Sequence, residues 1–280
     1  IEEQGHVTDL ITDEAVNWIA SRKEKPFFLY IPYTAVHLPV KEPQQWLDKV
    51  PTAITGEVAR HYAACIMHLD DSVGRILAAL DQAGKRRNTL VVFTSDNGGS
   101  WAENNDTKYP DDNYPTGKLT ASNKPLRGQK GELYEGGIRV PTLASWPAEI
   151  KPGKIDTPMH ISDWMPTFCV LAGWKPPQGK DLKWDGRNLL PVLTGRADPG
   201  PRPLYWTAPG FRASALRFGD FKLIVSGKED AQKTELFNLK DDPNETRDLA
   251  KEQPDQVKKL RAMLDEIARA DRDAVAPQDS

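Results

Sequence analysis

The feature that most constrains the fold is a long amphipathic stretch followed closely by a short apolar run. Across residues 57–83, apolar side chains recur at helical spacing, and Gly84 stands where a C-terminal cap belongs. Residues 90–93 (Leu-Val-Val-Phe) are then continuously apolar, which is typical of a strand buried on both faces. A helix that leads so directly into a buried strand predicts an α/β fold.

The same alternation recurs elsewhere in the chain. Residues 27–31 (Phe-Phe-Leu-Tyr-Ile) and 142–146 (Thr-Leu-Ala-Ser-Trp) predict two further buried strands. A helix is expected to begin at Thr12, which would cap it, and another near Asp163. Strands alternating with helices predict an α/β sandwich with a largely parallel central sheet.

The amino-acid composition changes after Gly173, where prolines and glycines become frequent, and we place a domain boundary at residues 175/176. Residues 213–218 and 221–225 alternate around Gly219-Asp220 and predict a hairpin, with 235–239 as a neighbouring strand. Residues 256–270 have a helical pattern. Residues 1–175 would thus form the larger α/β domain, and residues 176–280 a smaller subdomain with an antiparallel sheet and a helix.

Charge and composition exclude some functions. The formal net charge is -3 with both signs mixed along the chain, so no basic stripe is available for nucleic acid. No apolar run approaches the roughly 20 residues that cross a bilayer, so we expect no membrane partner. Cys65 and Cys169 both sit in apolar helical patterns, which predicts burial, and their spacing does not support a disulfide.

Polar side chains follow two of the predicted strands, at the edge where ligands collect in α/β sheets. Asp96 and Asn97 follow the run at 90–93, and their oxygens suit a hard cation, although Asn-Gly is also a hairpin signal. His37 follows the run at 27–31 between two prolines that stiffen its loop. Such a histidine can hold or protonate an anion, or it can simply pack.

A third candidate element is the glycine-rich stretch at residues 125–141. Its Lys130 carries a point charge that can reach a bound anion. Glu135 and Arg139 are spaced to pair with each other across the glycine turn between them, which favours a structural role for both. Structural roles are also expected for the remaining histidines, His6, His61, His68 and His160.

Taken in order, these elements resemble the type I, formylglycine-dependent sulfatases. The resemblance rests on Ala-Val-His-Leu-Pro at 35–39, Met-His-Leu-Asp-Asp-Ser-Val-Gly at 67–74, Thr-Ser-Asp-Asn-Gly-Gly at 94–99 and Leu-Arg-Gly-Gln-Lys-Gly-Glu-Leu-Tyr-Glu-Gly-Gly-Ile-Arg-Val-Pro at 126–141. Ile-Ser-Asp-Trp at 161–164 is similar to the arylsulfatase B branch. Further blocks match to residue 245, so the resemblance covers nearly the whole chain.

The resemblance implies a fold and a set of roles. It implies the C-terminal part of an alkaline-phosphatase-like α/β sandwich. Asp96 and Asn97 match two of the family's calcium ligands, with magnesium as the alternative ion. His37 matches the histidine at the sulfate, and Lys130 matches the lysine that bridges toward the sulfate and the nucleophile. Both would be catalytic and substrate-binding.

One element of the family pattern is missing. Neither cysteine is followed by the Cys-x-Pro-Ser-Arg context whose first residue becomes formylglycine, nor is its Ser-type equivalent found. The resemblance places that segment, the remaining metal-binding aspartates, and a further lysine and histidine before Ile1. We therefore expect half a site here, and an upstream half as a partner.

The expected function is that of a sulfuric ester hydrolase acting on sulfated carbohydrates or other sulfate esters, in the periplasm or outside the cell. Two alternatives stay open. One is a truncated, catalytically silent protein that binds sulfated sugars or a partner. The other is a phosphate or phosphonate ester hydrolase of the same superfamily.

Overall fold

The computed structural model describes residues 4–22, 24–104, 113–175, 182, 184–208, 210, 212–227 and 231–270. The chain divides into two compact units. The first comprises residues 1–91, 100–122 and 146–148, and the second comprises 92–99, 123–145 and 149–280. The predicted boundary at 175/176 stays a prediction.

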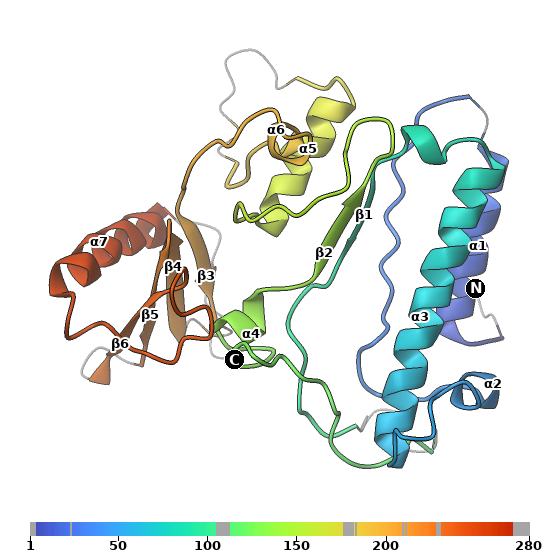
Figure 1. Ribbon diagram of the computed structural model, residues 1–280, viewed down its shortest axis with the longest axis horizontal. Helices are drawn as coiled ribbons and strands as arrows, with labels where there is room; N and C mark the ends of the chain where they lie inside the picture. The colour runs from blue at the N-terminus through green and yellow to red at the C-terminus, as the bar shows by residue number, and fades with distance from the viewer. Residues whose placement is uncertain are drawn as a thin grey trace, which may run out of the picture. The chain divides into compact units, whose positions relative to one another are not determined.

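Two helices dominate the first unit, α1 (Val7–Ser21) and α3 (Glu57–Gln82), which lie side by side (Figure 1). Their shared core contains Ala15 and Ile19 from α1 and Ile76, Ala79 and Leu80 from α3. The short α2 (Gln44–Leu47) packs its Trp46 against Ala64 of α3. A 3-10 turn, Arg86–Asn88, follows α3 and leads toward the first strand.

Helix α1 begins earlier than the sequence predicts. Its N-cap is His6, whose side chain accepts a hydrogen bond from the Thr8 backbone N–H. Thr12, the predicted cap, lies inside the helix and is fully buried, and its hydroxyl donates to the Thr8 carbonyl at 2.6 Å. The prediction that the helix begins at Thr12 is therefore wrong, because a histidine side chain provides the cap in its place.

Residues 27–31 are extended but belong to no strand among the described residues, so the predicted buried strand is wrong. Phe27, Leu29 and Ile31 pack on the core between α1 and α3. The alternate side chains point away from that core, with Phe28 66% and Tyr30 75% exposed. The apolar segment at residues 27–31 thus packs on the helix pair with one face, and its other face is exposed.

The predicted strands at 90–93 and 142–146 are present as β1 (Val91–Thr94) and β2 (Thr142–Ser145), which form a two-stranded sheet. The helical turn α4 (Glu135–Ile138) immediately precedes β2. A 3-10 turn, Ile161–Asp163, opens α5 (Trp164–Leu171), near the predicted helix start at Asp163, and α6 (Leu190–Leu193) follows. Apolar side chains of β1, β2, α5 and α6 share one core, which includes Val92, Ala144, Trp164, Leu189 and Leu193.

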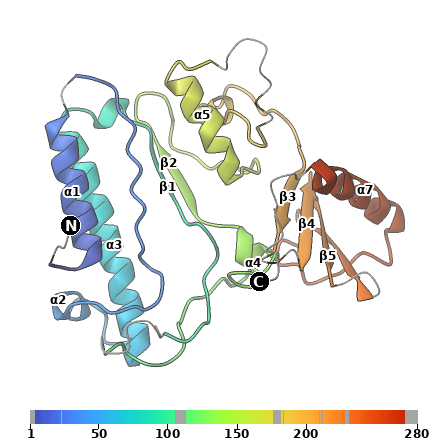
Figure 2. The same ribbon diagram turned by 180° about the vertical axis from the view of Figure 1, so that it is seen from behind.

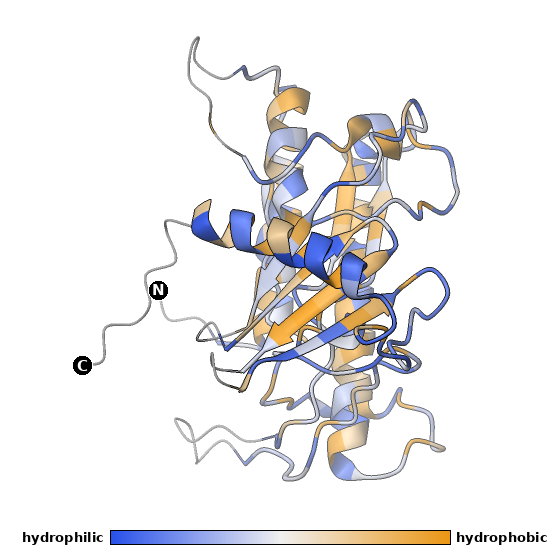
Figure 3. Ribbon diagram, turned by 90° about the vertical axis from the view of Figure 1, so that its left-hand side faces the viewer, coloured by the Kyte–Doolittle hydropathy of each residue, from blue (hydrophilic) through white to orange (hydrophobic). Residues whose placement is uncertain are grey.

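The C-terminal antiparallel sheet is confirmed. It runs in the order β3 (Leu204–Thr207), β4 (Ala213–Phe218), β5 (Phe221–Ser226) and β6 (Lys233–Asn238). Phe218 pairs with Phe221, which places Gly219 and Asp220 in the hairpin turn as predicted. The final helix, α7 (Pro254–Ala270), lies along this sheet (Figure 2), and it presents hydrophilic residues while the strands behind it are largely hydrophobic (Figure 3).

Both cysteines are free, and Cys65 is buried as predicted. Cys169 is only half-buried, because it lies on α5 beside the exposed Val170, so the prediction of its burial is wrong. Across the described residues, no helix combines the length and the apolar character that a bilayer span requires.

We expect the chain to self-associate through the face that carries Phe28 and Tyr30, because large exposed apolar side chains on an extended segment that belongs to no described strand favour association. The double substitution F28S/Y30S should shift the chain toward monomer and reduce apolar-dye binding. Size-exclusion chromatography with light scattering measures the first effect. The control is I66S, which removes a helical apolar side chain that is 47% exposed and should change neither. A wild-type chain that is monomeric and binds no dye contradicts the prediction.

Candidate functional site

The turn that follows β1 carries Asp96 and Asn97. Hydrogen bonds to its backbone fix its shape. The Ser95 hydroxyl donates to the Asn97 carbonyl at 2.9 Å, and the Gly98 N–H donates to the Gly137 carbonyl at 3.0 Å. Asp96 is exposed and Asn97 is half-buried. The two predicted metal ligands therefore stand at the carboxyl end of the strand, on a backbone held against the glycine-rich segment.

Close backbone contacts explain the glycines at this junction. A Cβ atom on Gly98 would lie 1.8 Å from the Gly136 carbonyl oxygen. A Cβ on Gly136 would lie 2.5 Å from the Arg127 oxygen, and one on Gly137 would lie 2.2 Å from the Glu132 oxygen. These separations are far below van der Waals contact, so only glycine allows the two segments to approach this closely.

Lys130 lies in the glycine-rich segment at residues 125–141, which together with the turn at residues 95–99 forms one glycine-rich framework. Its backbone N–H donates to the Gly99 carbonyl at 3.1 Å. Asn123 accepts a hydrogen bond from the Gly99 N–H at 2.8 Å and donates to the Gly128 carbonyl at 3.1 Å, so its side chain joins the turn to the lysine segment. The structure thus brings Asp96, Asn97 and Lys130 onto one network of backbone hydrogen bonds. Sequence reasoning missed Asn123, since nothing in its local sequence marks it.

A buried ion cluster lies beneath this framework. The Lys222 ammonium is 2.9 Å from a carboxylate oxygen of Glu135 and 2.9 Å from one of Glu245, and all three side chains are buried. The predicted pairing of Glu135 with Arg139 is therefore wrong. Arg139 is exposed, whereas a buried carboxylate requires a buried cation, which β5 supplies. Sequence spacing could not reveal a partner so distant in the chain.

Neighbouring side chains attach the segment further to the C-terminal sheet. The Tyr134 hydroxyl donates to the Glu235 carboxylate at 2.7 Å, and burial together with this bond raises the pKa of Tyr134 to about 12. The Arg127 guanidinium lies 3.9 Å from the Tyr134 ring centre and donates to the Glu245 carbonyl. These groups are committed to one another, so their role is structural.

His37 belongs to the first unit and is exposed. Its Nδ1 lies 2.6 Å from the Leu38 carbonyl oxygen, and its backbone N–H donates to the Thr34 carbonyl at 2.8 Å. Because a carbonyl can only accept, the hydrogen of the ring lies on Nδ1. Nε2 is then the atom that can accept or, when protonated, donate a hydrogen bond to a ligand.

Two other histidines have the structural roles that were predicted. His61 accepts a hydrogen bond from the Glu42 backbone N–H at 2.8 Å, and burial lowers its pKa. His160 caps the 3-10 turn that opens α5, and burial likewise lowers its pKa. Both rings therefore serve the backbone as neutral acceptors.

The remaining groups suit an anion and a hard cation. The side chains of Asp96 and Lys130 are both exposed, and within the described part of the chain they make no hydrogen bond or ion pair. A carboxylate and an amide oxygen are hard donors that fit calcium or magnesium, but they fill only part of the shell of either ion. The uncommitted ammonium of Lys130 can bind an anionic oxygen.

Comparison with known proteins identifies the family. A family model described as Sulfatase matches residues 2–174, and one described as N-sulphoglucosamine sulphohydrolase, C-terminal, matches residues 129–272. The chain belongs to the sulfatase family. The predicted membership of the sulfatase family is thereby confirmed.

Similar proteins support this assignment. A protein named Sulfatase from Formosa agariphila is 33% identical over 90% of this chain and 47% of its own length. The N-acetylgalactosamine-6-O-sulfatase of Bacteroides thetaiotaomicron is 29% identical over 93% of this chain and 51% of its own. The sulfatase chain thus spans about half the length of these curated relatives.

A solved structure shows the same fold. The crystal structure of Ps i-CgsB in complex with k-i-k-neocarrahexaose aligns with a TM-score of 0.81 at 30% identity, covering 99% of this chain and 57% of that one. The predicted α/β fold of this superfamily, with its small antiparallel sheet and C-terminal helix, is confirmed.

We expect G98A to destabilise the second unit by about 1–3 kcal/mol, because its methyl group would overlap the Gly136 carbonyl and force the two segments apart. The matched control is G74A in α3, where a Cβ meets nothing within 4 Å. That variant should be more stable than wild type by about 0.5–1 kcal/mol. Urea unfolding measures both. Equal stability of G98A and wild type would disprove the close approach.

Proposed function

We propose that this sulfatase chain, together with the further residues that its longer relatives have, hydrolyses sulfate esters of carbohydrates. The observation that carries the proposal is that two exposed charged side chains, Asp96 and Lys130, stand on one hydrogen-bonded, glycine-rich framework and have no partner among the described residues. The surrounding polar groups are bonded to one another, so these two are available for a ligand. Membership of the sulfatase family gives that ligand its chemistry.

Each candidate residue has a proposed role. The Lys130 ammonium binds a sulfate oxygen, and its attachment to the turn through Gly99 limits where it can reach. His37, whose ring is oriented by the Leu38 carbonyl, presents Nε2 to the sulfate or the leaving oxygen. Both stabilise charge that develops during cleavage of the ester. Asp96 and Asn97 hold a calcium ion, or magnesium as the alternative.

The metal and the nucleophile complete the site. When bound, calcium supplies Lewis-acid polarisation of the sulfate oxygens. The formylglycine expected in the upstream segment supplies covalent catalysis. Further oxygen ligands are expected from the same segment, because two donors from this chain leave most of the six to eight positions of calcium to be filled.

The substrate class is inferred from proteins similar to this chain. One relative is named N-acetylgalactosamine-6-O-sulfatase, and the aligned crystal structure is a complex with k-i-k-neocarrahexaose. We infer a sulfated carbohydrate as the substrate and the periplasm or the cell exterior as the location. Other sulfate esters, and phosphate or phosphonate esters, are the alternatives that an activity assay distinguishes.

The chain alone should not turn over an aryl sulfate in the presence of calcium. Its two cysteines lack the formylglycine context, and no other residue of the printed sequence replaces an activated nucleophile. Turnover above a heat-treated control that persists through further purification contradicts this. Co-expression with the upstream half of a related sulfatase should restore activity. If activity never appears and sulfated sugars still bind, the silent binding protein is the better description.

In the completed enzyme, we expect K130A and H37A each to lower kcat by about 100- to 1,000-fold, because each removes a group that stabilises developing charge. Substrates are an aryl sulfate, a sulfated oligosaccharide and the matched phosphate ester. The control K151A changes an exposed lysine outside the framework and should retain full kcat. Unchanged kcat in K130A rejects its proposed role, and a preference for the phosphate ester rejects the sulfatase assignment of the substrate.

Calcium binding to the chain alone should be weak, with dissociation constants of about 10⁻⁴–10⁻³ M, because water must replace the missing ligands. D96A should abolish it. The control D156A removes an exposed carboxylate paired with Lys154 and should leave binding unchanged. Calorimetric titration tests both variants. Tight stoichiometric binding that survives D96A would reject both the ligand assignment and the half-site.

A further inference from the structure

Three metal-binding side chains meet in the first unit, among residues that the proposed function does not use. They are His6, which caps α1, Asp9 in the first turn of α1, and His68 in α3. Their potential ligand atoms all lie within 4.8 Å of one another. The cluster joins the beginning of one helix to the middle of the other.

His68 is oriented as a metal-binding histidine would be. Its side chain is 1% exposed, and its Nδ1 is 2.8 Å from a carboxylate oxygen of Glu42. Because that oxygen can only accept, Nδ1 carries the hydrogen, and the neutral ring has its lone pair on Nε2. This Nε2 is buried with no hydrogen-bond partner, and it faces the Asp9 carboxylate oxygen at 3.2 Å. Two acceptors at this distance repel unless a proton or a metal ion lies between them.

His6 makes only long contacts, which a metal ion could replace. Its nitrogens contact the Thr8 N–H and the Lys41 carbonyl at 3.3 Å each, and the Glu42 carboxylate at 3.5 Å. All three distances exceed the usual range of about 2.7–3.2 Å, so the ring makes no strong bond. Its centre lies 4.9 Å from that of His68.

The charge balance of the cluster also favours a cation. Glu42 is buried, and Asp9, whose side chain is 36% exposed, places a second carboxylate beside the same buried histidine. The Arg75 guanidinium forms a loose ion pair with Asp9 at 3.6 Å and shares its charge with Asp13, to which it is hydrogen-bonded. A dication among the three ligands would add the positive charge that the buried Glu42 needs and that Asp9 receives only in part from Arg75.

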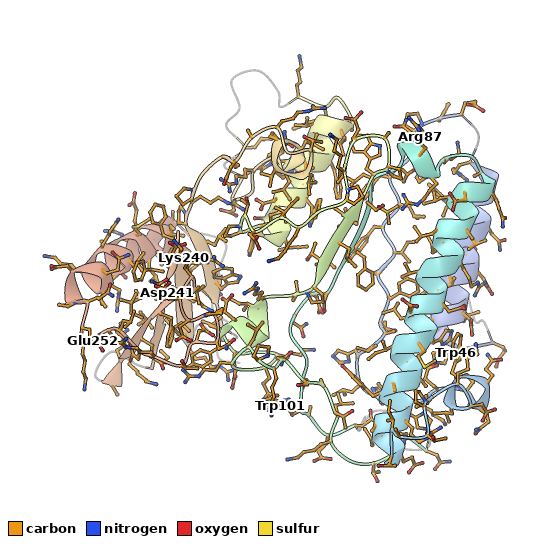
Figure 4. The ribbon with its side chains drawn as sticks, in the orientation of Figure 1. Trp46, Arg87, Trp101, Lys240, Asp241 and Glu252 are labelled. Carbon is orange, nitrogen blue, oxygen red and sulfur yellow. The ribbon has the colours of Figure 1, made fainter. Side chains whose placement is uncertain are left out.

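We propose that His6, Asp9 and His68 bind a zinc ion that fastens the start of α1 to α3. Two imidazoles and a carboxylate suit zinc, whereas calcium and magnesium prefer oxygen alone. Glu42 orients His68 through Nδ1, as carboxylates do behind metal-bound histidines. Trp46, which lies beside α3 in Figure 4, stacks on the His68 ring at 4.5 Å and fixes its plane. Water or an external ligand completes the fourth position.

The test titrates the chelator-treated 280-residue chain with zinc chloride in a calorimeter and follows its melting temperature. We expect one zinc per chain and a rise in Tm. D9N and H6Q should lose both effects, and their side chains are partly exposed, so folding should survive. E42Q should weaken zinc binding about 10–100-fold. Circular dichroism confirms that each variant is folded.

The matched control is D13N, which changes a carboxylate one turn further along α1 that also contacts Arg75 but lies outside the cluster. It should bind zinc as wild type does. Zinc-independent Tm in the wild-type chain overturns the proposal and leaves a protonated His68 between two carboxylates as the explanation. Equal loss of binding in D13N and D9N also overturns it. Neither result bears on the sulfatase activity, which involves other residues.

Discussion

The second unit depends on one buried lysine. Lys222 on β5 holds the carboxylates of Glu135 and Glu245, and the Glu135 backbone N–H donates to Glu245 at 2.6 Å. Burial raises the pKa of Glu245, and the ammonium of Lys222 opposes that shift. Removing one member of such a cluster leaves uncompensated buried charge, which typically costs about 3–5 kcal/mol. The glycine-rich segment is therefore fixed to the C-terminal sheet by electrostatics as well as by packing.

This anchorage determines what the candidate site can be. Because Glu135 is fixed, the neighbouring Gly136 and Gly137 are held where Gly98 approaches them. That contact in turn sets the turn carrying Asp96, and Asn123 transmits the same constraint toward Lys130. Buried, hydrogen-bonded side chains thus position the exposed side chains of Asp96 and Lys130. Preorganisation of this kind allows a few charged groups to act on a ligand without reorganising first.

The elements that local pattern defines were predictable. The amphipathic stretch at 57–83 became α3, and the alternation around Gly219-Asp220 became the β4–β5 hairpin in the expected register. Residues 27–31 were not predictable in this way, since a continuous apolar run does not tell which face is covered. Here α1 and α3 cover one face, and Phe28 and Tyr30 stay exposed. Likewise the histidine cap of α1 lies outside the usual preference for Ser, Thr, Asp and Asn.

For the site, local sequence indicated the candidate ligand-binding groups but not the groups that position them. Asp96 and Lys130 stand in recognisable motifs, whereas the partner of Glu135 lies 87 residues away and that of its backbone N–H 110 residues away. Lys222 occupies a strand whose neighbours are apolar, where a charge is expected only if its partner is known. The same holds for His68, which has the surroundings of a core residue in the sequence. Only the approach of Glu42, Asp9 and His6 shows that its buried Nε2 faces a carboxylate.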